Sequence, residues 1–261
     1  MRIALLVGDG YTSYLLSRRL IGSEDHPVVK VLLSTRYRRS VARTFKIARG
    51  KSLRWLAYRS FVALKSLLLG IAKGTTVARA SAEHGIVVEY TASMNETLSS
   101  GGVDECDLAL AINLDQVLSS TTLAAFPRGV VNVHASRLPA DRGVSPALWA
   151  FARGDTSVWA SFYRMDEGLD SGPIFRQIEI PICEFRSAVG MYEHVCAACG
   201  DELPTIIDGI ADGTLWAAEQ SQQPGSYNGV PDSEFDAHLR CSGRHMMTLA
   251  DIADVLVVDG R

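Results

Sequence analysis

Residues 108–134 read LALAINLDQVLSSTTLAAFPRGVVNVH, and this stretch contains the pattern that decides the fold. Two short apolar runs, at residues 108–112 and 130–134, have the length and composition of strands buried on both faces of a sheet. The segment between them, around residues 121–126, has helical character. Strand, helix and strand in this order predict a βαβ unit, in which the two strands run parallel.

The alternation continues on both sides of this unit. Further strands are predicted at residues 3–7, 28–33, 86–90, 160–164 and 174–180, and further helices at residues 12–20 and 77–83. Ser187 is placed to cap a long helix that runs to about residue 210 and ends at Gly213. The sequence therefore predicts an α/β, Rossmann-like fold, with a mostly parallel twisted sheet and helices on both of its faces.

Two regions interrupt or follow this alternation. Residues 26–82 contain many Lys and Arg but no Asp or Glu, and residues 53–71 have the apolar stripe of an amphipathic helix. We interpret residues 36–75 as a basic helical insertion that packs on the sheet or on a second subunit; binding to a membrane surface or to an anionic acceptor is the alternative. Residues 219–232 are rich in Gln, Ser, Gly and Pro. We therefore expect a catalytic domain over residues 1–215 and a linker with a small C-terminal extension over residues 216–261.

The composition is that of an ordinary globular protein. The 261 residues suffice for one large domain with a full core. The net charge of −3 argues against nucleic acid as the main partner, because domains that bind phosphates are usually basic. Five irregularly spaced cysteines do not form a secreted disulfide pattern, and the N-terminal apolar run is too short for a signal peptide. We expect a cytoplasmic protein without a transmembrane segment.

Three polar side chains are the candidate catalytic residues. Asn132 and His134 are two positions apart on one strand, so they face the same side, at the strand end where open α/β sheets bind ligands. Asp170 lies in a glycine-containing loop between two later strands and could fold back over that site to orient the histidine. An amide donor suits a developing oxyanion, and no Ser or Cys stands in an obvious nucleophile elbow, so direct transfer is favoured. The alternative is structural: a hydrogen-bonded histidine at a strand end and a turn-forming aspartate.

Residues 130–181 closely resemble the 10-formyltetrahydrofolate-dependent formyltransferases, which include glycinamide ribonucleotide formyltransferase and the catalytic domain of methionyl-tRNA formyltransferase. The family's Asn-x-His-x-Ser-x-Leu-Pro signature reads NVHASRLP at residues 132–139. Its later Asp-x-Gly-Leu-Asp-x-Gly stretch reads DEGLDSG at residues 166–172. The resemblance covers about residues 107–181 and is weak across the basic insertion and the C-terminal extension.

The resemblance implies a reaction and a set of contacts. A formyl group would pass from 10-formyltetrahydrofolate, the co-substrate, to an amine through a tetrahedral intermediate, with no metal. His134 would polarise the formyl carbonyl, Asn132 would bind the oxyanion, and Asp170 would help to remove the amine proton. The pterin contacts would be Asp115, Gln116, Val117, Leu118, Asp166, Glu167 and Gly168. The acceptor contacts that we predict are Gly8, Asp9, Gly10, Tyr11, Arg142, Gly143 and Ser145.

The sequence departs from several branches of the family, and these departures limit the possible acceptors. A methionyl-tRNA enzyme is expected to carry a further RNA-binding domain, and a formyltetrahydrofolate hydrolase a regulatory domain. A glycinamide ribonucleotide enzyme is expected to have a phosphate-cradling loop with an Asn, where this sequence has Gly8-Asp9-Gly10. We therefore expect a small-molecule amine or hydroxylamine, such as a nucleotide-linked amino sugar or a siderophore precursor, and leave a homodimer open.

Three competing interpretations remain. The Gly8-x-Gly10 pair could begin a dinucleotide-binding loop, but the third glycine and the ribose-binding acid are missing. Cys196 and Cys199 could suggest metal or redox chemistry, although small residues packed on one helix face explain them better. A catalytically inactive folate-binding or scaffold protein is the alternative from another class.

Overall fold

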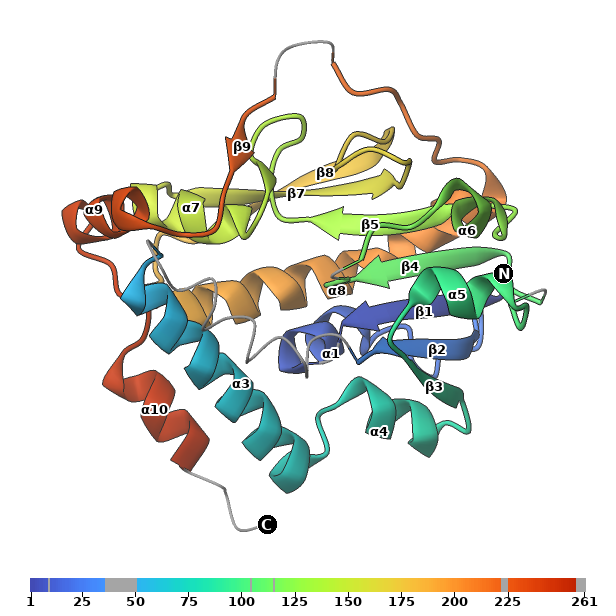
Figure 1. The fold of residues 1–261 in the computed structure, drawn as a ribbon, viewed down its shortest axis with the longest axis horizontal. Coiled ribbons are helices and arrows are strands. Elements are labelled where there is room, and N and C mark those ends of the chain that lie inside the picture. The colour runs from blue at the N-terminus through green and yellow to red at the C-terminus, as the bar shows by residue number, and fades with distance from the viewer. Residues whose placement is uncertain (9, 36–50, 104, 115, 222–224, 257–261) are drawn as a thin grey trace.

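The computed structural model describes residues 1–8, 10–35, 51–103, 105–114, 116–221 and 225–256. Its centre is a seven-stranded sheet in the order β3-β2-β1-β4-β5-β7-β8 (Figure 1). The strands are β1 (Ile3–Gly8), β2 (Val28–Ser34), β3 (Val87–Thr91), β4 (Leu108–Ile112), β5 (Val130–His134), β7 (Ser157–Arg164) and β8 (Ile174–Pro181). The first five run parallel, and β7 and β8 are antiparallel to their neighbours. The prediction of a mostly parallel α/β sheet is therefore confirmed.

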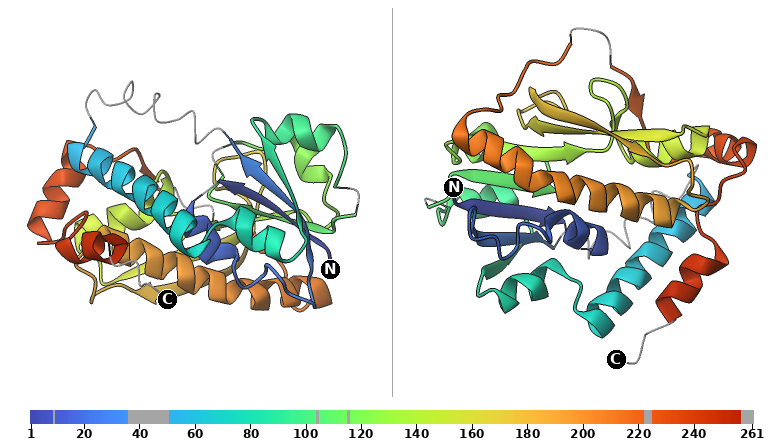
Figure 2. Two further views of the ribbon diagram at one scale, coloured as in Figure 1. Left: turned by 90° about the horizontal axis from the view of Figure 1, so that it is seen from below. Right: turned by 180° about the vertical axis from the view of Figure 1, so that it is seen from behind.

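Helices cover both faces of this sheet. Alternate residues of β1 point to opposite sides: Ile3, Leu5 and Val7 belong to one apolar cluster, and Ala4 and Leu6 to the other. The long helix α8 covers the first face, and α5 and α6 cover the second (Figure 2). The helices are α1 (Tyr11–Ser17), α3 (Leu53–Lys73), α4 (Val77–Glu83), α5 (Met94–Ser99), α6 (Ser120–Ala124), α7 (Pro146–Arg153), α8 (Ala188–Asp212), α9 (Ser233–Cys241) and α10 (Leu249–Leu256).

The ends of α8 lie where the sequence predicts them. The hydroxyl of Ser187 accepts a hydrogen bond from the Gly190 N–H, which satisfies one of the free donors of the first turn. Gly213 ends the helix with φ of 77°, a left-handed conformation that glycine adopts without a steric cost. None of the helices in the described part of the chain has the length and apolar character needed to cross a membrane.

The basic insertion is described only from residue 51 onward. The predicted amphipathic helix at residues 53–71 is present as α3, whose N-terminus is capped by Ser52 accepting from the Trp55 N–H. Its inward face buries Trp55 and Tyr58, and α3 contacts α1 and α10. Residues 36–50 of the predicted insertion lie outside the described residues.

The C-terminal extension packs against α7. Phe235 on α9 makes an edge-to-face contact with Trp149 on α7, with ring centroids 5.3 Å apart. Arg244 donates a hydrogen bond to the Phe151 carbonyl at 2.8 Å. A second, two-stranded sheet joins β6 (Arg142–Gly143) to β9 (Tyr227–Asn228), and thus joins the segment after β5 to the extension. The boundary that we predict at residue 215 stays a prediction.

Candidate active site

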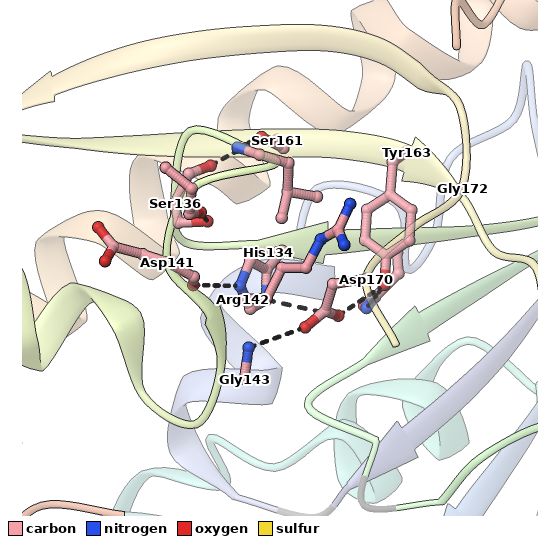
Figure 3. Close-up of polar contacts among 12 residues, drawn as sticks. His134, Ser136, Asp141, Arg142, Gly143, Ser161, Tyr163, Asp170 and Gly172 are labelled. Carbon is pink, nitrogen blue, oxygen red and sulfur yellow. Dashed lines mark hydrogen bonds and ion pairs between the residues drawn. The ribbon is translucent and has the colours of Figure 1, made fainter. Parts of the chain in front are cut away.

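The site lies where the strand order reverses between β1 and β4, beside the carboxyl end of β5. Ligands of open α/β sheets bind in the crevice that such a reversal creates. Asn132 and His134, at the end of β5, stand opposite Tyr163 and Ser161 on β7. The loop that follows β7 carries Asp170, so side chains from β5, from β7 and from the β7–β8 loop meet here (Figure 3).

Tyr163 joins the amide to the carboxylate. The Asn132 side-chain N–H donates to the Tyr163 hydroxyl at 2.9 Å, and this hydroxyl donates to Asp170 Oδ1 at 3.0 Å. Burial, and the neighbouring Asp170 carboxylate after it, raise the pKa of Tyr163 well above its usual range. The phenol therefore stays protonated and remains a donor to the carboxylate at ordinary pH.

Asp170 is buried, with 9% of its surface exposed, yet its carboxylate has three polar neighbours. Besides the phenol, the Gly143 N–H donates to Oδ2 at 3.1 Å, and His134 Nδ1 lies 3.7 Å from Oδ1. A buried carboxylate needs such partners because burial disfavours its charge. The loop also requires glycine at position 172, where a Cβ atom would lie 1.8 Å from the Arg164 carbonyl oxygen.

His134 is fixed from its other side by the loop after β5. Its Nε2 lies 3.1 Å from the Asp141 carbonyl oxygen, which can only accept, so Nε2 carries a proton. Backbone strain concentrates around this ring: Asp141, Ser145 and Asp170 all adopt the left-handed region, with φ of 55°, 53° and 51°. Non-glycine residues in this region are uncommon and cluster at functional sites, where the surrounding structure holds them in place.

Two residues of this cluster were not predicted from the sequence. Tyr163 is one polar position in an apolar strand, and only the antiparallel register of β7 against β5 brings it to Asn132. Gln220 lies in the stretch that we interpreted as a linker. Its side-chain N–H groups donate to the carbonyls of Asp170 and Gly172, both at 2.9 Å, and its oxygen accepts from Arg142 at 2.8 Å. No pattern in the sequence around Gln220 signals this role.

The predicted pterin contacts lie in two loops. Gln116 turns inward, where its side chain accepts from the Met94 N–H and donates to the Ser34 hydroxyl. The side chain of Val117 is 69% exposed, whereas that of Leu118 is buried. The Gln116 contacts hold the main chain of the first loop in place, and the apolar side chain of Val117 stays exposed.

The second loop is ordered by a turn. Asp166 accepts hydrogen bonds from the Gly168 N–H at 3.0 Å and from the Ser171 hydroxyl at 2.8 Å, while Glu167 is exposed. Hydrogen bonds thus order the described parts of both loops, and their contact with a pterin stays a prediction. Asp115 lies outside the described residues.

The predicted acceptor contacts fall into two groups. Arg142, Gly143 and Ser145 lie in the strained loop beside His134. Arg142 Nε is buried and has no hydrogen-bond partner among the described residues. Gly143 has φ of 99° and its N–H donates to the Asp170 carboxylate.

The other group, Gly8, Gly10 and Tyr11, lies between β1 and α1. There the Tyr11 N–H donates to the Ser66 hydroxyl of α3 at 3.1 Å, so α3 covers the start of α1. Asp9 lies outside the described residues.

The Cys196 and Cys199 pair does not have the surroundings of a reactive centre. Cys196 and Cys199 are buried in α8, and burial raises the pKa of the Cys199 thiol to about 12. Thiols with raised pKa values are poor nucleophiles and poor metal ligands. Among the described residues, no group of three or more His, Cys, Asp or Glu side chains is arranged to hold a metal ion.

An amide, an imidazole and a carboxylate thus lie together at the carboxyl end of a strand in a Rossmann-like sheet. The family model for formyl transferases matches residues 72–207, which is more than half of the chain. The protein belongs to the formyl transferase family.

Individual relatives agree with this membership. Methionyl-tRNA formyltransferase of Acidithiobacillus ferrooxidans is 34% identical over 118 residues, which are 45% of this chain and 36% of that protein. The match thus spans little more than a third of this curated relative's length.

Two solved structures are similar at the level of the fold. One is glycinamide ribonucleotide transformylase 1 from Symbiobacterium toebii, with a TM-score of 0.56, 18% identity, and coverage of 84% of this chain and 94% of that chain. The other is WlaRD, a sugar 3N-formyl transferase, with a TM-score of 0.57, 13% identity, and coverage of 96% and 80%. At such identities the likeness shows the fold alone.

Proposed function

We propose that this protein transfers a formyl group from 10-formyltetrahydrofolate to a primary amine or hydroxylamine of a small molecule, such as a nucleotide-linked amino sugar or a siderophore precursor. The observation that carries the proposal is the convergence of Asn132, His134 and Asp170, brought together by Tyr163 at the ligand-binding end of the sheet. Membership of the formyl transferase family supports the reaction class.

The geometry suggests a role for each side chain. Both ring nitrogens of His134 face acceptors, the Asp141 carbonyl and the Asp170 carboxylate, and the imidazolium is the form with a donor for each. One N–H of the Asn132 amide is used by Tyr163. The second has no partner among the described residues and binds the oxyanion as the amine nitrogen attacks the formyl carbon. The C–N bond to the folate then breaks. The proton that the amine loses passes by way of Asp170 to the folate nitrogen that leaves.

The surroundings of β1 bear on the acceptor. In α/β sheets the start of the helix after the first strand is a common phosphate site. Here the first N–H of α1, that of Tyr11, is bound by Ser66 of α3. This contact disfavours an acceptor phosphate at that point and weighs against a glycinamide ribonucleotide enzyme.

The other side of the site supports an anionic acceptor. The guanidinium of Arg142 lies beside His134 and Asp170 (Figure 3) and has a nitrogen without a partner among the described residues. The structure of WlaRD was obtained in the presence of dTDP and 5-N-formyl-THF. A nucleotide-linked amino sugar is therefore the acceptor class that we test first, with glycinamide ribonucleotide and methionyl-tRNA as alternatives.

The test incubates the protein with 10-formyltetrahydrofolate and a panel of amines, and detects formylated product by mass spectrometry. The variant Asp170→Asn keeps the size of the side chain but removes its charge, and Asp25→Asn is an exposed control. We expect transfer to one class of amine, a loss of at least about a hundredfold in Asp170→Asn, and none in the control. Saturable folate binding without transfer to any amine would support the inactive scaffold instead.

A further inference from the structure

The outward face of α3 carries four large exposed apolar side chains, one near its N-terminus and three in its second half. The side chains of Leu53, Leu64, Leu67 and Ile71 are 77%, 51%, 59% and 71% exposed. Helices on the surface of a globular protein normally turn charged or polar side chains to the solvent. A stripe of large exposed apolar side chains on one helix face is typical of a surface that binds a partner.

The stripe follows a strict heptad rhythm. Its members are separated by four, three, four, three and four residues: Leu53, Ala57, Ser60, Leu64, Leu67 and Ile71. This spacing is that of the a and d positions of a coiled coil, with the small residues Ala57 and Ser60 at two of them. Such a seam is narrower than the apolar face of a helix that lies on a sheet or in a membrane surface. The aromatic Trp55, which a membrane-bound helix would turn to the lipid, is buried on the opposite face. The seam therefore fits another helix.

The inward face of α3 is anchored separately, so exposure of the seam is not a result of loose packing. Lys65 is 7% exposed and pairs with Glu193 of α8 at 2.7 Å, and Tyr58 is 4% exposed. Helix α3 lies at the edge of the molecule beside α10 (Figures 1 and 2). Leu249 and Ile252 of α10 are also exposed, by 85% and 39%.

We propose that the outward face of α3 is a self-association surface, on which a second copy of this chain packs its own α3 in antiparallel orientation. A twofold axis near residue 62 brings Leu53 of one copy opposite Ile71 of the other. At both ends of the seam, two large side chains therefore pack against each other. The same axis brings the small residues opposite large ones, with Ala57 facing Leu67 and Ser60 facing Leu64.

This alternation of large and small residues fills the seam, as interdigitated packing requires. A parallel pair would instead place Ala57 opposite Ala57 and leave gaps. Such a twofold interface uses the same surface patch on both copies.

The size of the surface predicts a moderate affinity. The seam from Leu53 to Ile71 spans roughly 27 Å, at the rise of an α-helix. A standard interface buries about 800 Å² on each partner, which one helix face reaches only together with neighbouring elements such as α10. We therefore expect dimers that dissociate on dilution through the micromolar range.

Sedimentation velocity of the full chain, in reducing buffer from low to high micromolar concentrations, tests the proposal. Ala57→Glu and Leu67→Lys each put a charge into the seam, and we expect each variant to sediment as a monomer. When the two variants are mixed in equal amounts, the introduced carboxylate of one faces the introduced ammonium of the other at one contact. This pairing restores the dimer, which a parallel arrangement would not do. Trp216→Glu changes another exposed apolar residue, 75% exposed and outside α3 and α10, and should dimerise like the wild type.

Several results would overturn the inference. A wild-type protein that is monomeric at the highest concentration, or seam variants that dimerise fully, would exclude the surface. A mixture that stays monomeric would exclude the antiparallel pairing. Binding of the monomer to phosphatidylglycerol vesicles that Leu67→Lys or Ala57→Glu abolishes would assign the surface to a membrane instead. Circular dichroism melts verify that each variant is folded.

Discussion

Replacing Tyr163 by Phe removes one oxygen atom from the centre of the candidate site. The tyrosine is 2% exposed, and its hydroxyl accepts from the Asn132 amide and donates to Asp170 Oδ1. The ring that remains fills the same volume, so the substitution isolates the two hydrogen bonds. It leaves a buried amide donor and a buried carboxylate oxygen each short of one partner.

The cost follows from these two contacts. A hydrogen bond to a charged group contributes about 1.5–3 kcal/mol and a neutral one about 1 kcal/mol, so we expect Tyr163→Phe to lower the free energy of unfolding by about 2–4 kcal/mol. For a chain of this size that corresponds to a fall in Tm of roughly 5–15 °C. Because Asn132 and Asp170 also lose their mutual orientation, we expect kcat to fall about 10- to 100-fold, less than when an oxyanion donor itself is removed.

The free energy of unfolding should also depend on pH through Tyr163, in a direction that follows from its raised pKa. Burial raises the pKa of Tyr163 in the native state above that of the unfolded chain, so the native state holds the phenolic proton more tightly. The stability from this group is fully present below about pH 10 and is lost as the pH rises further. The difference in stability between wild type and Tyr163→Phe should therefore narrow at alkaline pH.

Urea unfolding and steady-state kinetics measure both effects, and Tyr14→Phe on α1 serves as the matched control. We expect the control to keep the wild-type kcat. If Tyr163→Phe retains the wild-type Tm and kcat, the phenol does not organise the site and the reasoning fails. A fall in Tm with an unchanged kcat would leave the phenol a purely structural role.

Three further predictions concern other parts of the molecule. Gln220→Ala removes the contacts that hold the loop of Asp170. We expect a fall in kcat of roughly tenfold with unchanged folate affinity, and an unchanged kcat would contradict this expectation. Glu193→Gln leaves the Lys65 ammonium buried without a countercharge and should cost about 3–5 kcal/mol in urea unfolding. The double variant Lys65→Met/Glu193→Leu should regain most of this loss, and a double variant as unstable as the single one would refute the account. A thiol reagent should modify only Cys183 and Cys241 in the native protein, since the other three of the five thiols are buried; labelling of a third thiol before unfolding would show local opening.

The pattern of apolar residues along the sequence was sufficient to predict helices that have one apolar and one polar face, and strands that are short apolar runs. The limits of β4 and β5 agree with the predicted residues, because short apolar runs bounded by polar or glycine residues leave few alternatives. Helix α7 was not predicted. Its residues 146–152 are all buried, so the segment has no polar face and no helical period to recognise.

Some residues of the candidate site could likewise be predicted from the sequence, and others could not. Asn132, His134 and Asp170 belong to local motifs, and the structure brings them together. Tyr163 and Gln220 act through contacts that exist only after the sheet and the extension have folded. Such contacts depend on strand register and on chain segments 31 to 50 residues apart, which local sequence patterns do not encode.

The C-terminal extension contributes to the site itself. The Asp141 carbonyl that faces His134 belongs to a residue in a strained conformation, which must be held by its surroundings. Its carboxylate accepts from Asn228 at 2.9 Å and pairs with Arg153 at 3.1 Å, and its N–H donates to the Ser226 hydroxyl at 2.7 Å. Two of these three contacts come from the extension. We therefore expect changes in the extension to alter the orientation of the imidazole, and the shape of the loop that we propose faces the acceptor, without any change at Asn132, His134 or Asp170. Relatives that share the signature motifs could therefore act on different acceptors because their C-terminal extensions differ. A comparison of the motifs alone would not include this segment.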